Sequence, residues 1–171
     1  MAKIFCVANQ KGGVGKTTTS VNLSAGLAKL NQRVLLVDLD PQGNATMGAG
    51  IDKAELKGST YEVLLGEADV ASSRMRSEAG RFDVLPSNRE LAGAEVEMVD
   101  LDKRERRLKD ALELVAGDYD FILIDCPPAL SMLTLNGLCA ANGVIMALEE
   151  ANAKKTVKGY VFKFEKFELL N

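Results

Sequence analysis

The sequence predicts an α/β fold in which a mostly parallel sheet carries helices on both of its faces. Short apolar runs alternate along the chain with stretches of helical periodicity, a pattern typical of parallel strands joined by crossover helices. The run "RVLLVDLD" is apolar at five of its eight positions, as expected for a strand that is covered on both faces. A glycine-rich segment separates the first apolar run from the first helical stretch.

The predicted elements follow one another with short connections. In chain order, the expected strands are residues 3–8, 33–40, 81–86, 120–125 and 143–148. The expected helices are residues 17–30, residues 59–66, one or two helices between 88 and 116, and residues 130–140. Residues 41–50 are expected to form a polar loop that contains glycine. The first helix should bury one side, which carries Val21, Leu23, Leu27 and Leu30. A second buried stripe is expected at Leu101, Leu108, Leu112 and Val115.

The last residues have a different character. Tyr160, Phe162 and Phe164 alternate with other residues at a strand-like period, and they do not continue the preceding pattern. We therefore divide the chain into a core, residues 1–148, and an atypical tail, residues 149–171.

Composition excludes several classes of function. With 171 residues the length suits one domain, and the net charge of −3 gives no general attraction to nucleic acid or to anionic membranes. The chain has no histidine, which excludes histidine acid–base chemistry and most zinc sites. Cys6, Cys126 and Cys139 lie far apart in the sequence, and we expect buried thiols in a reducing compartment. No signal-peptide core or membrane-spanning run is present, so we expect a cytoplasmic protein without membrane contact.

The segment "GGVGK" indicates a phosphate-binding loop because it lies between an apolar strand and a helix. Three glycines, Gly12, Gly13 and Gly15, would let the backbone N–H groups curl around phosphates at the start of a helix. Lys16 would neutralise the β and γ oxygens, Thr17 would ligate Mg²⁺, and Thr18 would reach the α-phosphate. Two features depart from the usual pattern: Gln10 replaces its first glycine, and Lys11 is an additional lysine.

Acidic residues end two of the predicted strands. Asp38 and Asp40 lie at the carboxyl end of the second strand, and Asp125 closes the fourth. In an open parallel sheet, ligands bind beyond the carboxyl ends of the strands, so we expect these acids to converge on the glycine loop. An aspartate that closes an apolar strand is typical of a Walker B metal-shell residue. The alternative for each aspartate alone is a helix cap or a turn.

Together, "KGGVGKTT", "VDLDPQGN", "LIDCPP" and "NRELAGAE" resemble the deviant-Walker ATPases, specifically the ParA/Soj chromosome and plasmid partition proteins. The resemblance extends from about Lys3 to about Ile145. It implies a P-loop NTPase fold of the deviant Walker A type, truncated, in which Gln10 is tolerated and Lys11 is the signature lysine.

The resemblance also implies a set of site residues with ATP and Mg²⁺ as cofactors. The catalytic residues would be Lys11, Lys16 and Asp40, with Asp40 orienting the attacking water. The metal would be held by Thr17, Asp38 and Asp125. The nucleotide would contact Gln10, Lys11, Gly12, Gly13, Val14, Gly15, Lys16, Thr17 and Thr18.

The implied partners are a second copy of the chain, a ParB-type centromere-binding protein and non-specific DNA. Lys11 would reach across an ATP-sandwich dimer to the phosphates of the other subunit, and the protein would associate with the nucleoid. DNA contact by this chain is less secure, since the family's basic residues lie beyond the resemblance.

Other functions remain open at this stage. The chain could be a catalytically impaired fragment that at most binds nucleotide or a partner. MinD-like membrane switching would need an amphipathic C-terminal helix, whereas this tail alternates like a strand. Electron transfer as in the nitrogenase iron protein would need cysteines placed to bridge a cluster.

Overall fold

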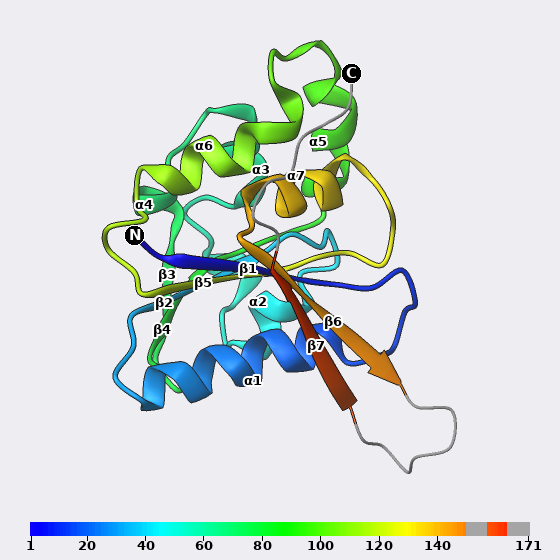
Figure 1. Cartoon of the computed structure of the whole chain (residues 1–171). Helices are drawn as coiled ribbons and strands as arrows, with labels where there is room; N and C mark the ends of the chain where they lie inside the picture. The colour runs from blue at the N-terminus through cyan, green and yellow to red at the C-terminus, as the bar shows by residue number, and fades with distance from the viewer. Residues whose placement is uncertain (150–156, 164–171) are drawn as a thin grey trace.

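A mostly parallel sheet runs through the molecule, and the computed structural model describes residues 1–149 and 157–163 (Figure 1). Within those ranges the sheet has seven strands in the order β3-β4-β2-β5-β1-β6-β7. Strands β4, β2, β5, β1 and β6 are parallel, while β3 and β7 pair antiparallel at the two edges. The strands are β1 (Lys3–Ala8), β2 (Val34–Asp38), β3 (Met75–Ser77), β4 (Phe82–Leu85), β5 (Phe121–Asp125), β6 (Gly143–Glu149) and β7 (Val157–Lys163).

Helices cover both faces of the sheet, which confirms the predicted fold class (Figure 1). Helices α1 and α2 lie on one face, and α3, α5, α6 and α7 lie on the other. The α-helices are α1 (Lys16–Lys29), α2 (Asn44–Gly48), α3 (Thr60–Leu65), α4 (Val70–Ser73), α5 (Leu91–Glu97), α6 (Arg107–Glu113) and α7 (Met132–Ala140). Short 3₁₀ helices are η1 (Lys53–Glu55), η2 (Met98–Asp100) and η3 (Arg104–Arg106).

The apolar core has two layers because side chains alternate along each strand. In β2, Val34 and Leu36 face the layer below α1 and α2, whereas Leu35 and Val37 face the larger layer below α3, α5, α6 and α7. All five residues of β2 are buried, as its apolar sequence predicts for a strand covered on both faces.

Several expectations about local structure were confirmed and others were wrong. All five expected strands are present, as β1, β2, β4, β5 and β6. The expected stripe is buried at Leu108, Leu112 and Val115. Leu30 is 70% exposed, because α1 ends at Lys29 and Leu30 is its C-cap. Residues 41–50, expected to be a loop, contain helix α2, and the short strand β3 and helix α4 were not expected.

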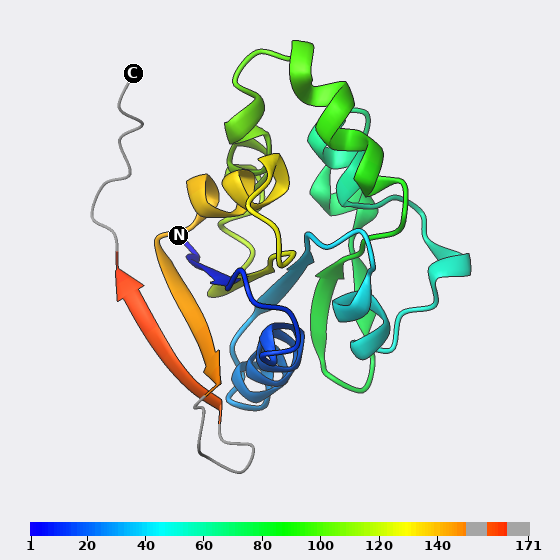
Figure 2. The same cartoon turned by 90° about the vertical axis from the view of Figure 1, so that its right-hand side faces the viewer.

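The described part of the tail adds a strand to the sheet, as its alternating pattern predicted. Strand β7 pairs antiparallel with β6 along its whole length, from Gly143 opposite Lys163 to Glu149 opposite Val157. Figure 2 shows β7 as the outermost strand beside β6. Phe164 and Phe167 lie outside the described residues, and the division at residue 148 stays a prediction. Among the described residues, no helix has the length and apolar character needed to cross a membrane.

Candidate functional site

The loop between β1 and α1 has the backbone conformation that its glycines allow. Gly13 (φ 74°) and Gly15 (φ 85°) occupy the left-handed region, which non-glycine residues rarely adopt. Gly15 is the N-cap of the 14-residue helix α1 and provides no side-chain cap. The first N–H groups of α1 therefore face the loop without a capping oxygen, an arrangement suited to an anion. A Cβ added at Gly12 or Gly13 would meet no atom within 4 Å, so the loop surface is open there.

Asn9 fixes the start of this loop. Its Nδ2 donates to the carbonyl oxygen of Ala147 in β6 at 2.6 Å, and its Oδ1 accepts from the backbone N–H of Lys11 at 2.9 Å. Gln10 follows it and lines an apolar cavity of about 360 Å³ between the loop and the segment after β5. The loop is thus tied to β6 through a side chain at its first residue.

Lys16 is the buried cation of the site. It is the first residue of α1, it is 7% exposed, and its Nζ donates to the carbonyl oxygen of Lys11 at 3.2 Å. Lysine is seldom buried without a charged partner, so its position over the loop suits a residue that neutralises an anion. Val14 is buried within the same loop.

Asp125 joins the carboxyl end of β5 to the start of α1. Its Oδ2 accepts from Thr17 Oγ1 at 2.7 Å, and its Oδ1 accepts from Ser20 Oγ at 2.8 Å. The carboxyl group is fully buried, and this burial raises its pKa to about 6 although both hydroxyls and Lys16 act in the opposite direction. The predicted convergence of Asp125 with the glycine loop is therefore present.

Asp38 lies beside Asp125, because β2 and β5 pair with these two residues in register. Its Oδ2 accepts from both the N–H and the hydroxyl of Thr46 at 2.7 Å, and its Oδ1 accepts from the N–H of Asp40 at 3.2 Å. Burial raises its pKa to about 7. Because each of its oxygens accepts a hydrogen bond from Thr46 or Asp40, Asp38 holds the segment that follows β2 in place.

Asp40 lies at the surface end of that segment and is partly exposed. Its Oδ1 accepts from the N–H of Gln42 at 2.9 Å, and its carbonyl oxygen accepts from Ser87 Oγ at 2.8 Å. The segment turns at Gly43 (φ 63°), where an added Cβ would lie 2.7 Å from the carbonyl oxygen of Ser87. The backbone position of Asp40 is thus set by residues that follow β4.

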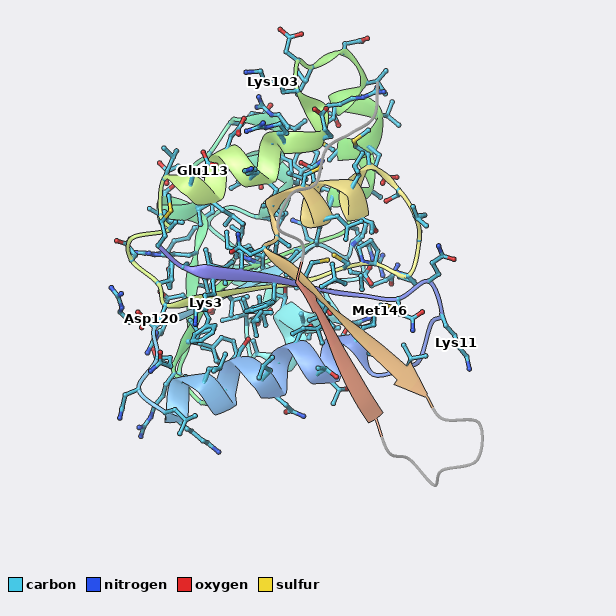
Figure 3. The ribbon with its side chains drawn as sticks, in the orientation of Figure 1. Lys3, Lys11, Lys103, Glu113, Asp120 and Met146 are labelled. Atoms are coloured by element: carbon cyan, nitrogen blue, oxygen red, sulfur yellow. The ribbon has the colours of Figure 1, made fainter. Side chains whose placement is uncertain are left out.

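Lys11 and Thr18 are on the exposed side of the loop. Figure 3 shows the side chain of Lys11 directed away from the body of the molecule. The position of Lys11 is compatible with a contact to another molecule, and it differs from that of Lys16, which folds back onto its own loop.

The residues present fit a phosphate group and a hard divalent cation. Glycine backbone, a helix N-terminus and a buried lysine together suit phosphate oxygens. The hydroxyl of Thr17 and the carboxylate of Asp125 are the oxygen ligands that Mg²⁺ takes, with phosphates and water completing its shell. Among the described residues, no group of three acidic or cysteine side chains is placed to hold a metal ion.

Two of the three cysteines are neighbours in space. Cys6 of β1 and Cys126, the residue after β5, are buried, as expected, and their sulfur atoms lie 3.1 Å apart. The contact with Cys6, together with burial, raises the pKa of the Cys126 thiol. Cys139 is partly buried on α7.

Sequence reasoning missed Ser20, Thr46 and Asn9, which position the predicted residues. Ser20 could have been found, since it lies three residues after Thr17 and four after Lys16 on the same helical face. Thr46 and Asn9 give no comparable local signal, because their partners are eight and 138 residues away.

The fold and this site define a phosphate-loop domain, and the comparison with family models assigns the family. A model described as an AAA domain matches residues 2–167, so the chain belongs to that family. The resemblance to the ParA/Soj proteins is confirmed by relatives of known name. The chain is 52% identical over 149 residues to the sporulation initiation inhibitor protein Soj of Bacillus subtilis, covering 87% of this chain and 59% of Soj.

Further relatives and solved structures agree with this assignment. The chromosome partitioning protein ParA of Myxococcus xanthus is 50% identical over 149 residues, covering 87% of this chain and 53% of that protein. A structure of cobyrinic acid a,c-diamide synthase from Mycobacterium smegmatis with a bound ATP analogue and magnesium has a TM-score of 0.83 at 47% identity, covering 85% of this chain and 59% of that one. The chain spans a little over half the length of the curated relatives it matches.

Proposed function

We propose that the chain binds Mg-ATP at residues 10–18 and hydrolyses it slowly, as a nucleotide-dependent switch in chromosome or plasmid partition. The observation that carries this proposal is the 2.7 Å hydrogen bond between Thr17 and Asp125, which brings the hydroxyl of the loop to the carboxylate that ends β5. The similarity to Soj and ParA, and to a structure with bound ATP analogue and magnesium, supports the choice of ligand.

Each site residue has a stated role in this proposal. The loop N–H groups and Lys16 bind the β- and γ-phosphates, and Thr18 contacts the α-phosphate. Thr17 and Asp125 would hold the cation, and Asp38, beside Asp125 on the neighbouring strand, would support the metal site. Magnesium held there would neutralise charge on the phosphate oxygens. Asp40, held by Gln42 and Ser87, orients a water molecule for attack on the γ-phosphoryl group.

Lys11 has a separate role across a dimer. We propose that its exposed side chain contacts the phosphates bound to a second copy of the chain, where it stabilises charge that develops during hydrolysis. A ParB-type protein is the proposed stimulating partner, on the basis of the partition relatives. Non-specific DNA is proposed as a further partner, without assigned residues.

Thermal melting with and without Mg-ATP tests the binding step. A ligand at a hundredfold excess over its dissociation constant adds about 2.7 kcal/mol to stability. In a domain of this size that raises the melting midpoint by roughly 5–10 °C. We expect this shift in the unaltered chain and its loss in Lys16→Ala. A midpoint that ignores Mg-ATP would refute the proposed site.

Phosphate release separates hydrolysis from binding. Asp40→Ala should keep the Mg-ATP melting shift and lose turnover, and Lys11→Ala should keep the shift and lose both turnover and ATP-dependent dimerisation. A Lys11→Ala chain that binds Mg-ATP as poorly as Lys16→Ala would contradict the role across the dimer. A melting shift without any turnover would refute the proposed hydrolysis and leave a nucleotide-binding protein.

A further inference from the structure

An arginine-rich hollow lies at the amino-terminal ends of the parallel strands, on the edge of the sheet opposite the phosphate loop. Its volume of about 630 Å³ is in the range of small-molecule sites. Arg33 precedes β2, Arg81 precedes β4, and the end of α1 contributes Ala28. Figure 3 shows Asp120, which precedes β5, and Lys11 at opposite ends of the molecule.

The lining of this hollow is positively charged although the chain as a whole is negative. Arg33, Arg74, Arg76 and Arg81 line it together with Asp83 and Asp118. Four arginines against Asp83, Asp118 and Asp120, which pairs with Arg33, leave a local charge of +1, against −3 for the whole chain. A concave surface with one sign of charge concentrates ligands of the opposite sign.

Three of the arginines come from one hairpin. Arg74 has an extended backbone (φ −64°, ψ 145°) and directly precedes β3, in which Arg76 is the second residue. Two residues apart on an extended chain, their side chains point to the same side. Arg81 is at the turn into β4, where its own N–H donates to the carbonyl oxygen of Ser77 at 2.7 Å. The hairpin thus presents three guanidinium groups to the hollow.

These guanidinium groups retain donors for a ligand. Arg76 uses Nη1 to contact Asp83 Oδ1 at 2.9 Å. Arg74 uses Nη1 to contact the hydroxyl of Tyr119 at 2.6 Å and Asp118 Oδ2 at 3.4 Å. A guanidinium has five N–H donors, so most donors of both residues are outside these contacts. Within the described ranges, the Arg81 side chain makes no hydrogen bond or ion pair.

Arg33 contributes to the wall in a different way. Its Nε and Nη2 donate to Asp120 at 3.3 and 2.9 Å, and its Nη1 donates to the carbonyl oxygen of Gly117 at 3.4 Å. These contacts use three of its five donors, and its Nε and Nη2 both hold it against Asp120. The ligand-facing groups are therefore Arg74, Arg76 and Arg81.

We propose that this hollow binds the phosphate group of a small molecule through Arg74, Arg76 and Arg81. Guanidinium groups recognise phosphate with paired N–H bonds, which makes arginine the residue suited to such sites. The hollow is large enough for a nucleotide, and the carboxylates of Asp83 and Asp118 in its wall oppose a continuous polyanion such as DNA. This site is independent of the proposed Mg-ATP site, and either can fail alone.

Titration calorimetry with inorganic pyrophosphate tests the proposal. The phosphate loop also takes phosphates, so the reference protein carries Lys16→Ala. Adding Arg76→Ala and Arg81→Ala to that protein should weaken pyrophosphate binding about tenfold or more, because charge-assisted hydrogen bonds are lost. The matched control adds Arg106→Ala, an exposed arginine paired with Asp110 at 3.6 Å outside the hollow, and should bind like the reference. Melting curves establish that each protein is folded.

AMP, titrated in parallel, distinguishes the source of the phosphate. Tighter binding of AMP than of pyrophosphate, with the same dependence on Arg76 and Arg81, identifies a nucleotide ligand; the reverse order identifies an inorganic one. The proposal is overturned if neither probe loses affinity in the hollow variants. It is also overturned if duplex DNA alone depends on these arginines.

Discussion

The two ends of the neighbouring strands β2 and β5 carry charge in opposite ways. Arg33 and Asp120 directly precede the paired residues Val34 and Phe121, and they form an exposed ion pair at 2.9 Å. Hydrogen bonds from Arg33 lower the pKa of Asp120 to about 2. At the other end, Asp38 and Asp125 lie opposite each other, fully buried, and burial raises their pKa values to about 7 and about 6.

The two ends differ in their effect on stability: the exposed ion pair favours folding, whereas the buried carboxyl groups at the candidate site oppose it. An exposed pair of opposite charges is stabilised by its own attraction and by water. Two adjacent buried carboxyl groups oppose folding unless nearby hydrogen-bond donors offset the free energy of removing them from water. Thr17, Ser20 and Thr46 provide those donors. Ionisable groups held at such cost are typical of binding and catalytic sites.

The largest expected effect is at the buried end. Asp38→Ala removes the acceptor for two donors of Thr46 and for the N–H of Asp40, and it should lower the free energy of unfolding by about 3 kcal/mol. In thermal melting this corresponds to a drop of roughly 6–12 °C. Asp120→Ala is the matched variant at the exposed end and should have a clearly smaller effect. If Asp38→Ala and Asp120→Ala lowered the free energy of unfolding equally, the buried and exposed ends of the strands would not differ in their importance for stability.

Packing behind Asp125 should give the next largest effect. A Cβ at Gly137 of α7 would lie 2.8 Å from the sulfur of Cys126 and 3.2 Å from Leu39, so Gly137→Ala should destabilise by about 1–3 kcal/mol. Gly26 of α1 has no atom within 4 Å of an added Cβ, and Gly26→Ala should stabilise by roughly 0.5–1 kcal/mol. Urea unfolding measures both. An unchanged free energy of unfolding in Gly137→Ala would show that α7 can shift to accommodate the added methyl group.

A smaller effect is expected for the hydroxyl that bonds Asp125. Ser20→Ala removes the 2.8 Å bond to Oδ1 and should cost about 1 kcal/mol in urea unfolding. Ser24 is equally buried, but it donates only to the carbonyl oxygen of Ser20, so Ser24→Ala should be close to neutral. If both substitutions lower the free energy of unfolding equally, burial of the serine side chain, and not the hydrogen bond to Asp125, determines the loss.

The smallest effect concerns the exposed pair and depends on pH. The pKa of Asp120 is about 2 in the folded chain, below the ordinary aspartate value of 3.8. A carboxyl group with a lowered pKa stabilises the fold fully above its unfolded pKa and loses this contribution as pH falls through the folded pKa. The melting midpoint of Asp120→Asn should thus lie slightly below that of the unaltered chain at pH 6. The gap should close as pH falls from about 4 toward 2. A gap that widens on acidification would contradict the ion-pair assignment.

The strand and loop pattern was predictable from sequence because its signals are local. An apolar run that ends in Asp38 or Asp125 shows where a strand ends, and the parallel sheet then brings both residues to one edge. The role of Thr46 as a hydroxyl donor was not predictable, because a threonine in a polar segment looks like a surface residue. The Cys6–Cys126 contact was missed because it depends on β1 pairing with β5, 120 residues away.

Two local misjudgements have equally physical causes. Periodicity places Leu30 on the apolar side of α1, but it cannot tell that the helix ends one residue earlier. Strand β3 has only three residues, Met75–Ser77, too few for an alternation to show.

The face that α1 buries against the sheet has a mechanical consequence. Ser20 and Ser24 are fully buried on this face and Lys16 is 7% exposed, while the larger apolar side chains of α1 are only partly buried. The bonds from Thr17 and Ser20 to Asp125 hold the start of the helix against the end of β5. We therefore expect the start of α1 and the carboxyl end of β5 to move together, because a closely packed interior transmits a displacement from one element to its neighbour.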